Sequence, residues 1–497
     1  MDAADLSIAE ASALIADGGL SASELVGACL ARIAERDGTH SHEGDPASIN
    51  AWVRVYEDSA VEAAARADRE RPDPLPPLWG IPVGLKDLYA VAGRPLTASS
   101  SLLDERPSVD CDAWSRLRAQ GMILLGHLHT HEFAVGGTTD QVGNPWALER
   151  TSGGSSGGSA AALAARMVPA ATGTDTAGSL RIPSALSGVS TIKPTRGRVS
   201  LRGVVPLATS LDHAGPMART LEDCAVLLAG MSGPDLGRPG SALAGDPPAS
   251  LPRQRSGARP LAGIRLALSP RTGLVSLDDD VAHGVTRALA ACEELGAVLV
   301  EPSPPGVPLE IGAEYLDVLY AELLVFHRRF DDRREHYRPS LREWVEQAEA
   351  RGTSAERYVD AQRSRRETTA GFARWLQDER ITAVLEPTVP CVAPARGDGY
   401  DHAGSDYELI SLTHYWNWTG VPVVALPSGV GSRSGLPVSV SLIGPAGSDW
   451  DLLDAGIQLQ AALGVPDPYA AGSSPSSPSG GLASTTDVSI CRSGMFQ

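Results

Sequence analysis

The chain has 497 residues, 42% of them apolar and 21% charged, with a formal net charge of −18. This composition supports a large buried core, and the net acidity argues against a nucleic-acid or anionic-membrane surface. The six cysteines are scattered along the chain, which favours reduced thiols over disulfides. We find neither an apolar run of about 18 residues nor an N-terminal basic segment followed by an apolar one. We therefore expect a cytoplasmic protein with no membrane contact.

Two capping boxes open the chain, Ser7 with Glu10 and Ser21 with Glu24, and each precedes apolar residues at helical spacing. The first of these helices should end at the glycine pair 18–19. Apolar runs then predict strands at 51–55, 81–85 and 122–125 and helices at 59–69 and 160–166. Strands that alternate with helices predict an α/β layer fold.

The second half begins with a Gly-, Pro-, Ser- and Arg-rich stretch, residues 232–260, which we interpret as a loop. Residues 309–377 form a charged, almost wholly helical region. The remaining patterns predict strands at 263–268, 297–300, 383–385, 421–426 and 436–442 and a helix at 278–295. We expect one domain over residues 1–470, followed by a disordered low-complexity tail over 471–497.

Lysine is rare in this chain: 40 of the 42 basic residues are arginine, and only Lys86 and Lys193 are lysine. A guanidinium stays protonated in proteins, whereas burial can make an ammonium group neutral, so that it can act as a base. Lys86 follows the apolar run 81–85 and is therefore a candidate general base. Codon bias with chance survival of two lysines is the alternative explanation.

A serine- and glycine-rich segment, residues 153–159, precedes a helix pattern, and Ser179 follows a second run of small residues, 173–178. Small residues before a serine can free backbone N–H groups to bind an oxyanion. A serine nucleophile needs a base, and no histidine lies in a setting comparable with that of Lys86. A flexible linker is the alternative, but linkers rarely continue into structured segments of this kind.

Three other motifs compete with this interpretation. Residues 153–157 match G-x-S-x-G, but 147–151 are a poor strand for a nucleophile elbow. Residues 190–193 match S-x-x-K, but Pro194 follows directly, and that motif belongs on a helix. His127, His129 and His131 alternate as metal ligands on a strand face would, but without an evident partner set, so a surface or loop role is favoured and no metal is expected.

These segments resemble the amidase signature hydrolases over about residues 5 to 465. The match lies in the lysine segment 80–87, the serine loop 153–159, the nucleophile loop 175–181, the segment 193–200 that resembles the following strand, and the segments 210–216 and 435–438. The resemblance implies a single large, mixed, twisted β-sheet covered by helices on both faces. It also implies hydrolysis of an amide without a cofactor.

Residue by residue, the resemblance implies that Ser179 is the nucleophile, that Ser155 is a bridging serine on a cis peptide bond, and that Lys86 is the base. Further expected site residues are Thr176, Ala177 and Gly178, whose amides would form an oxyanion hole with that of Ser179; Ala134 on the acyl side; and the supporting Ser156, Asp175 and Arg181. Ala177 replaces a glycine that many members have, which should be tolerated if its φ is negative.

The main functional hypothesis is a stand-alone amidase for a small-molecule carboxamide or anilide, with no nucleic-acid partner and with a homodimer as one possible assembly. The alternatives are a glutaminase-type subunit of a tRNA-dependent amidotransferase and a urethane or ester hydrolase of the same family. Residues 414–420 are bulky and aromatic, and they either form a wall of an apolar pocket or pack in the core. Tyr315, Tyr320 and Phe326 are further pocket candidates.

Overall fold

A computed structural model of the chain describes residues 2–233, 246–397, 399–402, 404 and 407–470. The tail expected at 471–497 lies outside the described residues, as does 234–245 within the expected loop 232–260. Within the described residues, no helix is long and apolar enough to cross a membrane.

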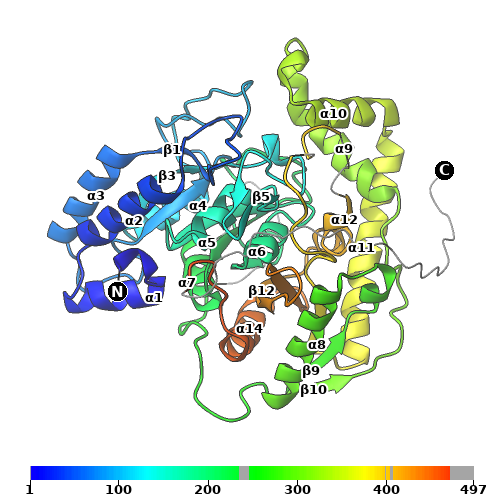
Figure 1. Ribbon diagram of the computed structural model, residues 1–497. Helices are drawn as coiled ribbons and strands as arrows, with labels where there is room; N and C mark the ends of the chain where they lie inside the picture. Colours follow the sequence, from blue (N-terminus) through cyan, green and yellow to red (C-terminus); the bar gives the residue numbers. More distant parts are fainter. Residues whose placement is uncertain (1, 234–245, 398, 403, 405–406, 471–497) are drawn as a thin grey trace.

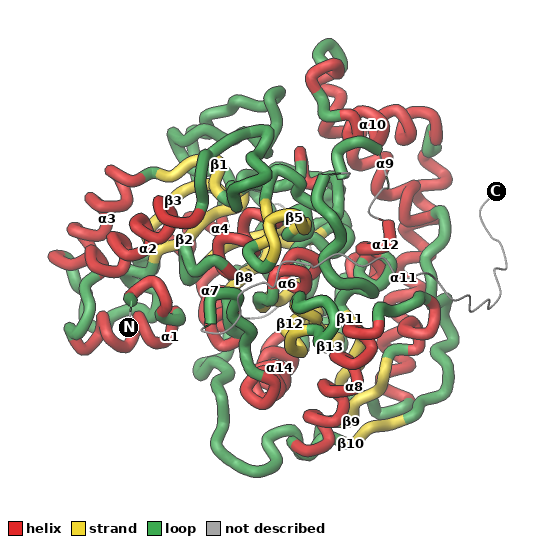
Figure 2. The backbone as a smooth tube through the Cα atoms, in the orientation of Figure 1, coloured by secondary structure: helices red, strands yellow, loops and turns green. Residues whose placement is uncertain are grey.

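An 11-stranded sheet forms the centre of the molecule (Figures 1 and 2). Its strands, in spatial order, are β1 (Trp52–Val55), β3 (Ile123–Leu128), β2 (Pro82–Lys86), β6 (Ala170–Asp175), β8 (His213–Ala218), β7 (Ser190–Lys193), β12 (Val423–Val430), β13 (Pro437–Ile443), β11 (Ala383–Pro387), β9 (Arg265–Leu268) and β10 (Val298–Val300). The neighbours β3, β2 and β6 are parallel, as are β11, β9 and β10, and the other pairs are antiparallel. The predicted mixed sheet is confirmed.

Helices cover both faces of this sheet (Figure 1). Both predicted capping boxes are present, and Gly18 ends the first helix in a left-handed conformation. The helices are α1 (Ile8–Asp17), α2 (Ala22–Arg36), α3 (Glu57–Arg69), α4 (Asp112–Ala119), α5 (Gly157–Ala164), α6 (Arg181–Ser187), α7 (Leu221–Met231), α8 (Asp279–Glu294), α9 (Glu314–His327), α10 (Pro339–Arg351), α11 (Ala355–Asp378), α12 (Tyr407–Ile410), α13 (His414–Thr419) and α14 (Asp449–Leu463).

The expected helical region is confirmed as α9, α10 and α11, which lie together on the right of Figure 1. Helix α9 packs against both α10 and α11, and α11 also packs against the short helix α13. This region is therefore connected through α11 to α13, which comes from a later part of the chain.

Several elements differ from the sequence predictions. The pattern missed strand β6 because its residues are Ala-Ala-Thr-Gly-Thr-Asp, without a large apolar side chain. Side chains from neighbouring segments pack closely on this strand, since a Cβ on Gly173 would lie 2.6 Å from Leu180 Cδ2 and 2.9 Å from Met217 Sδ. The segment 193–200 is not a strand, since β7 ends at Lys193 and a turn follows.

Candidate active site

The carboxyl ends of β2 and β6 place the first site residues side by side. The two strands are parallel neighbours, so their ends meet at one edge of the sheet. Lys86 is the last residue of β2 and Asp175 the last of β6. Ser155, just before α5, completes the contact: Lys86 Nζ donates to Ser155 Oγ at 2.7 Å and to Thr174 Oγ1 at 2.8 Å.

The setting of Lys86 favours a neutral amine. The side chain is fully buried, and burial lowers its pKa well below the usual value, opposed by the charges of Asp175 and Asp212. Both of its partners are hydroxyl groups, which can donate as well as accept. A neutral amine can therefore donate to Thr174 and accept a proton from Ser155.

Lys193 is equally buried, and burial again lowers its pKa, but its surroundings differ. Its Nζ donates to the carbonyl oxygens of Pro194 at 3.2 Å and Val421 at 2.6 Å. A carbonyl oxygen only accepts, so these partners use Lys193 as a donor. The two lysines therefore differ in the chemistry that their contacts allow.

Ser155 is held in a defined orientation. The Gly154–Ser155 peptide bond is cis, as the resemblance implied. The carbonyl oxygen of Ser155 accepts from the His131 N–H at 3.0 Å and from Thr139 Oγ1 at 3.2 Å. A Cβ on Gly154 would meet the backbone of Thr138, so this position requires glycine.

The 175–180 loop presents Ser179 and a series of backbone N–H groups. Ser179 is 6% exposed, and within the described residues its hydroxyl has no hydrogen-bond partner. The N–H groups of residues 176 to 179 likewise have no acceptor among the residues that the structure describes. Ala177 does not have a positive φ, whereas Gly178 has φ 140°. The methyl group of Ala177 is therefore compatible with this loop.

A buried ion pair between Asp175 and Arg181 anchors the start of the loop. Arg181 Nε and Nη2 donate to the two carboxylate oxygens of Asp175 at 2.9 Å each. Burial alone would raise the pKa of Asp175, but the Arg181 charge and hydrogen bonds outweigh it and hold the pKa below its usual value. Ser156 Oγ, also buried, bonds the backbone of Thr174 at 3.4 Å.

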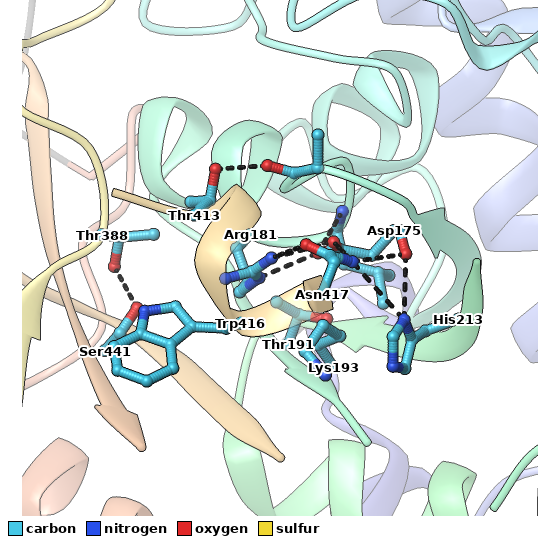
Figure 3. A network of polar contacts seen from close by, with 12 residues as sticks. Asp175, Arg181, Thr191, Lys193, His213, Thr388, Thr413, Trp416, Asn417 and Ser441 are labelled. Atoms are coloured by element: carbon cyan, nitrogen blue, oxygen red, sulfur yellow. Dashed lines mark hydrogen bonds and ion pairs between the residues drawn. The ribbon is translucent and has the colours of Figure 1, made fainter. Parts of the chain in front are cut away.

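Asn417 of α13 completes this anchor and was not predicted. Its amide nitrogen donates to the carbonyl and to the carboxylate of Asp175, both at 2.8 Å, and its oxygen accepts from Arg181 at 2.7 Å. Figure 3 shows Asn417 between Arg181 and His213. The pattern of residues 414–420 gave no signal for this role, because aromatic neighbours surround the asparagine.

A small pocket lies beside the loop. It brings together the predicted residues Ala134 and Thr176 with Thr174, the partner of Lys86. The other lining residues are Leu201, Val204, Val205, Pro206, Leu207 and Asp212. The walls are mainly apolar, with one buried carboxyl group, Asp212, which accepts from Thr176 Oγ1 at 2.6 Å. Burial raises the pKa of Asp212.

The three histidines are buried, so the expected surface position is wrong. His127 lies in strand β3, whereas His129 and His131 lie in the loop that follows it, as the alternative of a loop role predicted. His127 contacts the Tyr56 hydroxyl at 2.8 Å, His129 contacts Ser99 Oγ at 3.2 Å, and His131 contacts the Thr138 carbonyl at 3.1 Å. Burial lowers the pKa of each. In the part of the chain that the structure describes, no group of three or more His, Cys, Asp or Glu residues is arranged to hold a metal ion.

The two competing serine motifs are also decided by the fold. Residues 190–193 form strand β7 rather than a helix, which removes the S-x-x-K interpretation. Residues 147–151 do form a strand, β5 (Ala147–Thr151), although the sequence indicated a poor one. This strand pairs with β4 (Gly143–Asn144) in a separate two-stranded sheet and forms a bridge to Ala395, outside the central sheet. Ser155 contacts a lysine rather than a histidine, so a nucleophile elbow is not formed.

Core packing accounts for the aromatic residues of α13. Tyr415, Trp416 and Trp418 are buried in the hydrophobic core, and none lines the pocket described above. Tyr320 and Phe326 also lie outside its lining; Tyr320 packs on Trp344 and Phe326 on Phe133. Tyr315 contacts the loop directly, since its hydroxyl donates to the Thr176 carbonyl at 2.8 Å.

We expect Gly178→Ala to destabilise the protein and to disturb the loop. The φ of 140° excludes most side chains, and the new methyl group would meet Thr413 Oγ1 and Ile182 Cδ1. Such strain costs on the order of 1–3 kcal/mol, measurable as a loss in melting temperature. Gly27→Ala in α2 is the matched control, because nothing lies within 4 Å of its added Cβ; it should stabilise slightly. Equal melting temperatures for the two variants would contradict the expected strain at Gly178.

Comparisons with known proteins identify the family of the chain. The family model described as Amidase matches residues 28–453. A curated relative from Ralstonia nicotianae, named as a glutamyl-tRNA(Gln) amidotransferase subunit, is 37% identical over 474 residues, which cover 87% of this chain and 92% of the relative.

Solved structures show the same fold. One, described as a vestigial protein complex that reveals the origins of an s-triazine catabolic enzyme, superimposes with a TM-score of 0.80 at 30% identity and covers 93% of this chain and 99% of its own. A glutamyl-tRNA(Gln) amidotransferase subunit from Thermotoga maritima superimposes with a TM-score of 0.74 at 27% identity and covers 94% of this chain and 96% of its own.

These relatives correct the partner prediction. A small-molecule amide substrate and no nucleic acid were expected, with a homodimer as one possible assembly, whereas the curated relatives are named as subunits of an amidotransferase for glutamyl-tRNA(Gln). The acidic composition gave the wrong prediction about nucleic acid, because net charge describes the surface of one chain only. An enzyme made of several subunits can bind nucleic acid elsewhere in the assembly.

Proposed function

Because this chain belongs to the amidase family, a family of hydrolases that act on amide C–N bonds, we propose that it is the glutaminase-type subunit of a tRNA-dependent amidotransferase. In this role it hydrolyses the side-chain carboxamide of glutamine and releases ammonia for transfer to a misacylated tRNA. The observation that carries the proposal is the contact of Lys86 with Ser155, whose neighbour Ser156 donates its N–H to the Ser179 carbonyl at 3.3 Å, in a chain whose curated relatives bear that subunit's name.

The proposed mechanism uses the buried lysine as a base. Neutral Lys86 takes the proton of Ser155, and Ser155 takes that of Ser179 as the Ser179 oxygen attacks the carboxamide carbon. The N–H groups of the 175–180 loop stabilise the oxyanion. The proton then returns to the leaving nitrogen, ammonia departs, and water releases the acid from the Ser179 ester.

The lining of the pocket links it to the proposed catalytic groups. Thr174 and Thr176, on its wall, connect it to Lys86 and to the loop that carries Ser179.

The test is ammonia release from glutamine by the chain assembled with the other subunits of the amidotransferase, in the presence of glutamyl-tRNA(Gln). We expect glutamine-dependent formation of glutaminyl-tRNA. In the assembly with Ser179→Ala, glutamine should fail as the donor, while added ammonium chloride should still support amidation, because ammonium bypasses this subunit. If glutamine is inert in the parent assembly while the isolated chain hydrolyses other amides, the proposal is wrong.

A further inference from the structure

Two hydroxyl groups from distant parts of the chain donate hydrogen bonds to two consecutive peptide groups of the 175–180 loop. Tyr315 Oη, from α9, donates to the Thr176 carbonyl at 2.8 Å, and Thr413 Oγ1, just before α13, donates to the Ala177 carbonyl at 2.5 Å. The donors lie 139 and 236 residues away along the chain. Neither hydroxyl group has a place in the proposed proton transfers.

We propose that Tyr315 and Thr413 are positioning residues that aim the oxyanion-binding N–H groups of Ala177 and Gly178. A trans peptide unit is planar, so its C=O and N–H point in opposite directions. A hydroxyl group bonded to the Thr176 carbonyl therefore fixes the direction of the Ala177 N–H. A hydroxyl group bonded to the Ala177 carbonyl fixes that of the Gly178 N–H in the same way.

The two hydroxyl groups are themselves fixed. Tyr315 is 5% exposed, and its ring packs against His414 and Trp418 at centroid distances of 5.3 and 6.2 Å. Burial raises the pKa of Tyr315, so the phenol stays protonated and donates. Thr413 is 2% exposed, and its hydroxyl lies against Gly178, where an added methyl group would meet it.

This arrangement also strengthens the N–H donors. A hydrogen bond to a carbonyl oxygen polarises the whole peptide group and makes its N–H a better donor. Preorganised N–H groups of this kind usually make the largest single contribution to the rate enhancement of acyl transfer. A third tether, from Thr176 Oγ1 to Asp212 at 2.6 Å, holds the side chain of the same residue and leaves both peptide groups to Tyr315 and Thr413.

The inference rests on the proposed role of Ser179, and its test uses acylation by p-nitrophenyl acetate, which does not require glutamine. Tyr315→Phe and Thr413→Val should each slow the acylation burst roughly ten- to a hundredfold. This decrease in rate is no larger than the one caused by removing an oxyanion donor itself. Thr413→Ser keeps the hydroxyl group and should react nearly as the parent does. Tyr320→Phe is the matched control on α9, because its hydroxyl donates to Gln347 at 3.0 Å, away from the loop.

A second measurement separates positioning from a general packing defect. Butyraldehyde adds to a serine hydroxyl and forms a tetrahedral oxygen that the N–H groups bind, whereas butyrate binds without that adduct. In Tyr315→Phe and Thr413→Val, inhibition by the aldehyde should weaken in proportion to the burst rate, while butyrate inhibition and the pH dependence of the burst stay unchanged. Equal weakening of both inhibitors, or parent burst rates in both variants, would overturn the inference.

The outcomes distinguish this inference from the proposed function. A burst that persists in Ser179→Ala would remove the assigned nucleophile, and the inference with it. A normal burst in a chain whose assembly does not use glutamine would count against the proposed function alone.

Discussion

Lys86→Arg is expected to lower turnover by about a hundredfold or more, as much as Lys86→Ala, because this is the usual scale for losing a general base. Arginine keeps the positive charge but cannot give up its proton at usable pH. The lysine lies between two hydroxyl groups at 2.7 and 2.8 Å, where only a neutral amine can accept a proton. Steady-state rates of the purified variants, normalised to folded protein, provide the measurement.

Lys193→Arg is the matched control for this prediction. The sequence alone predicts a mild effect, but Lys193 is fully buried and donates to two carbonyl oxygens. The larger guanidinium should therefore lower the melting temperature, while the rate per folded molecule stays within a few fold of the parent. A Lys86→Arg enzyme as active as Lys193→Arg would end the proposed mechanism.

The same lysine sets the pH dependence of the rate. Burial lowers the pKa of Lys86, so activity should be full above the lowered value and fall as pH drops through it, when the amine becomes protonated. Stability should follow the same sign. Between the folded and unfolded pKa values the unfolded chain binds the extra proton, so the free energy of unfolding rises with pH in that window.

Ser179→Ala should abolish acyl-enzyme formation, with a loss of turnover on the order of 10⁴-fold or more, since nucleophile removal in a serine hydrolase reaches about a millionfold. The fold should be retained, because within the described residues the Ser179 hydroxyl has no hydrogen-bond partner to lose. Mass spectrometry after reaction with a fluorophosphonate measures the labelled residue in the parent.

Two other serines serve as internal controls for that labelling. Ser155 Oγ accepts from Lys86, and Ser190 Oγ is bonded between the Arg219 carbonyl and Gln460. Label on Ser155 would mean that the bridging and attacking roles are exchanged. Label on Ser190 would restore the S-x-x-K interpretation, even though that segment is a strand.

The sequence by itself predicted the elements with strong local signals. The capping boxes at Ser7 and Ser21 fixed two helix starts, because the side chain and backbone that satisfy each other are three residues apart. The β2 and β3 strands were predicted from short apolar runs. Strand β6 was missed because its residues are small and give no apolar strand pattern. Their small size is explained by close packing in the folded chain, which no local pattern encodes.

The candidate catalytic set was also predictable from the sequence. Lysine is rare enough for Lys86 to stand out, and the small residues around Ser155 and Ser179 are needed for local backbone geometry: Gly154 precedes a cis bond and Gly178 has φ 140°. Each of these signals lies within a few residues of the side chain concerned. The same short segments therefore encode both the candidate catalytic side chains and the backbone conformation around them.

Only the tertiary structure decided which groups surround that set. Asn417 reaches Asp175 across 242 residues, and Tyr315 and Thr413 reach the loop across 139 and 236. These contacts depend on the order of strands in the sheet and on how α9 and α13 pack, which no spacing along the chain specifies. The histidines show the same limit, because their alternation is visible in the sequence while their burial follows from the layers that cover them.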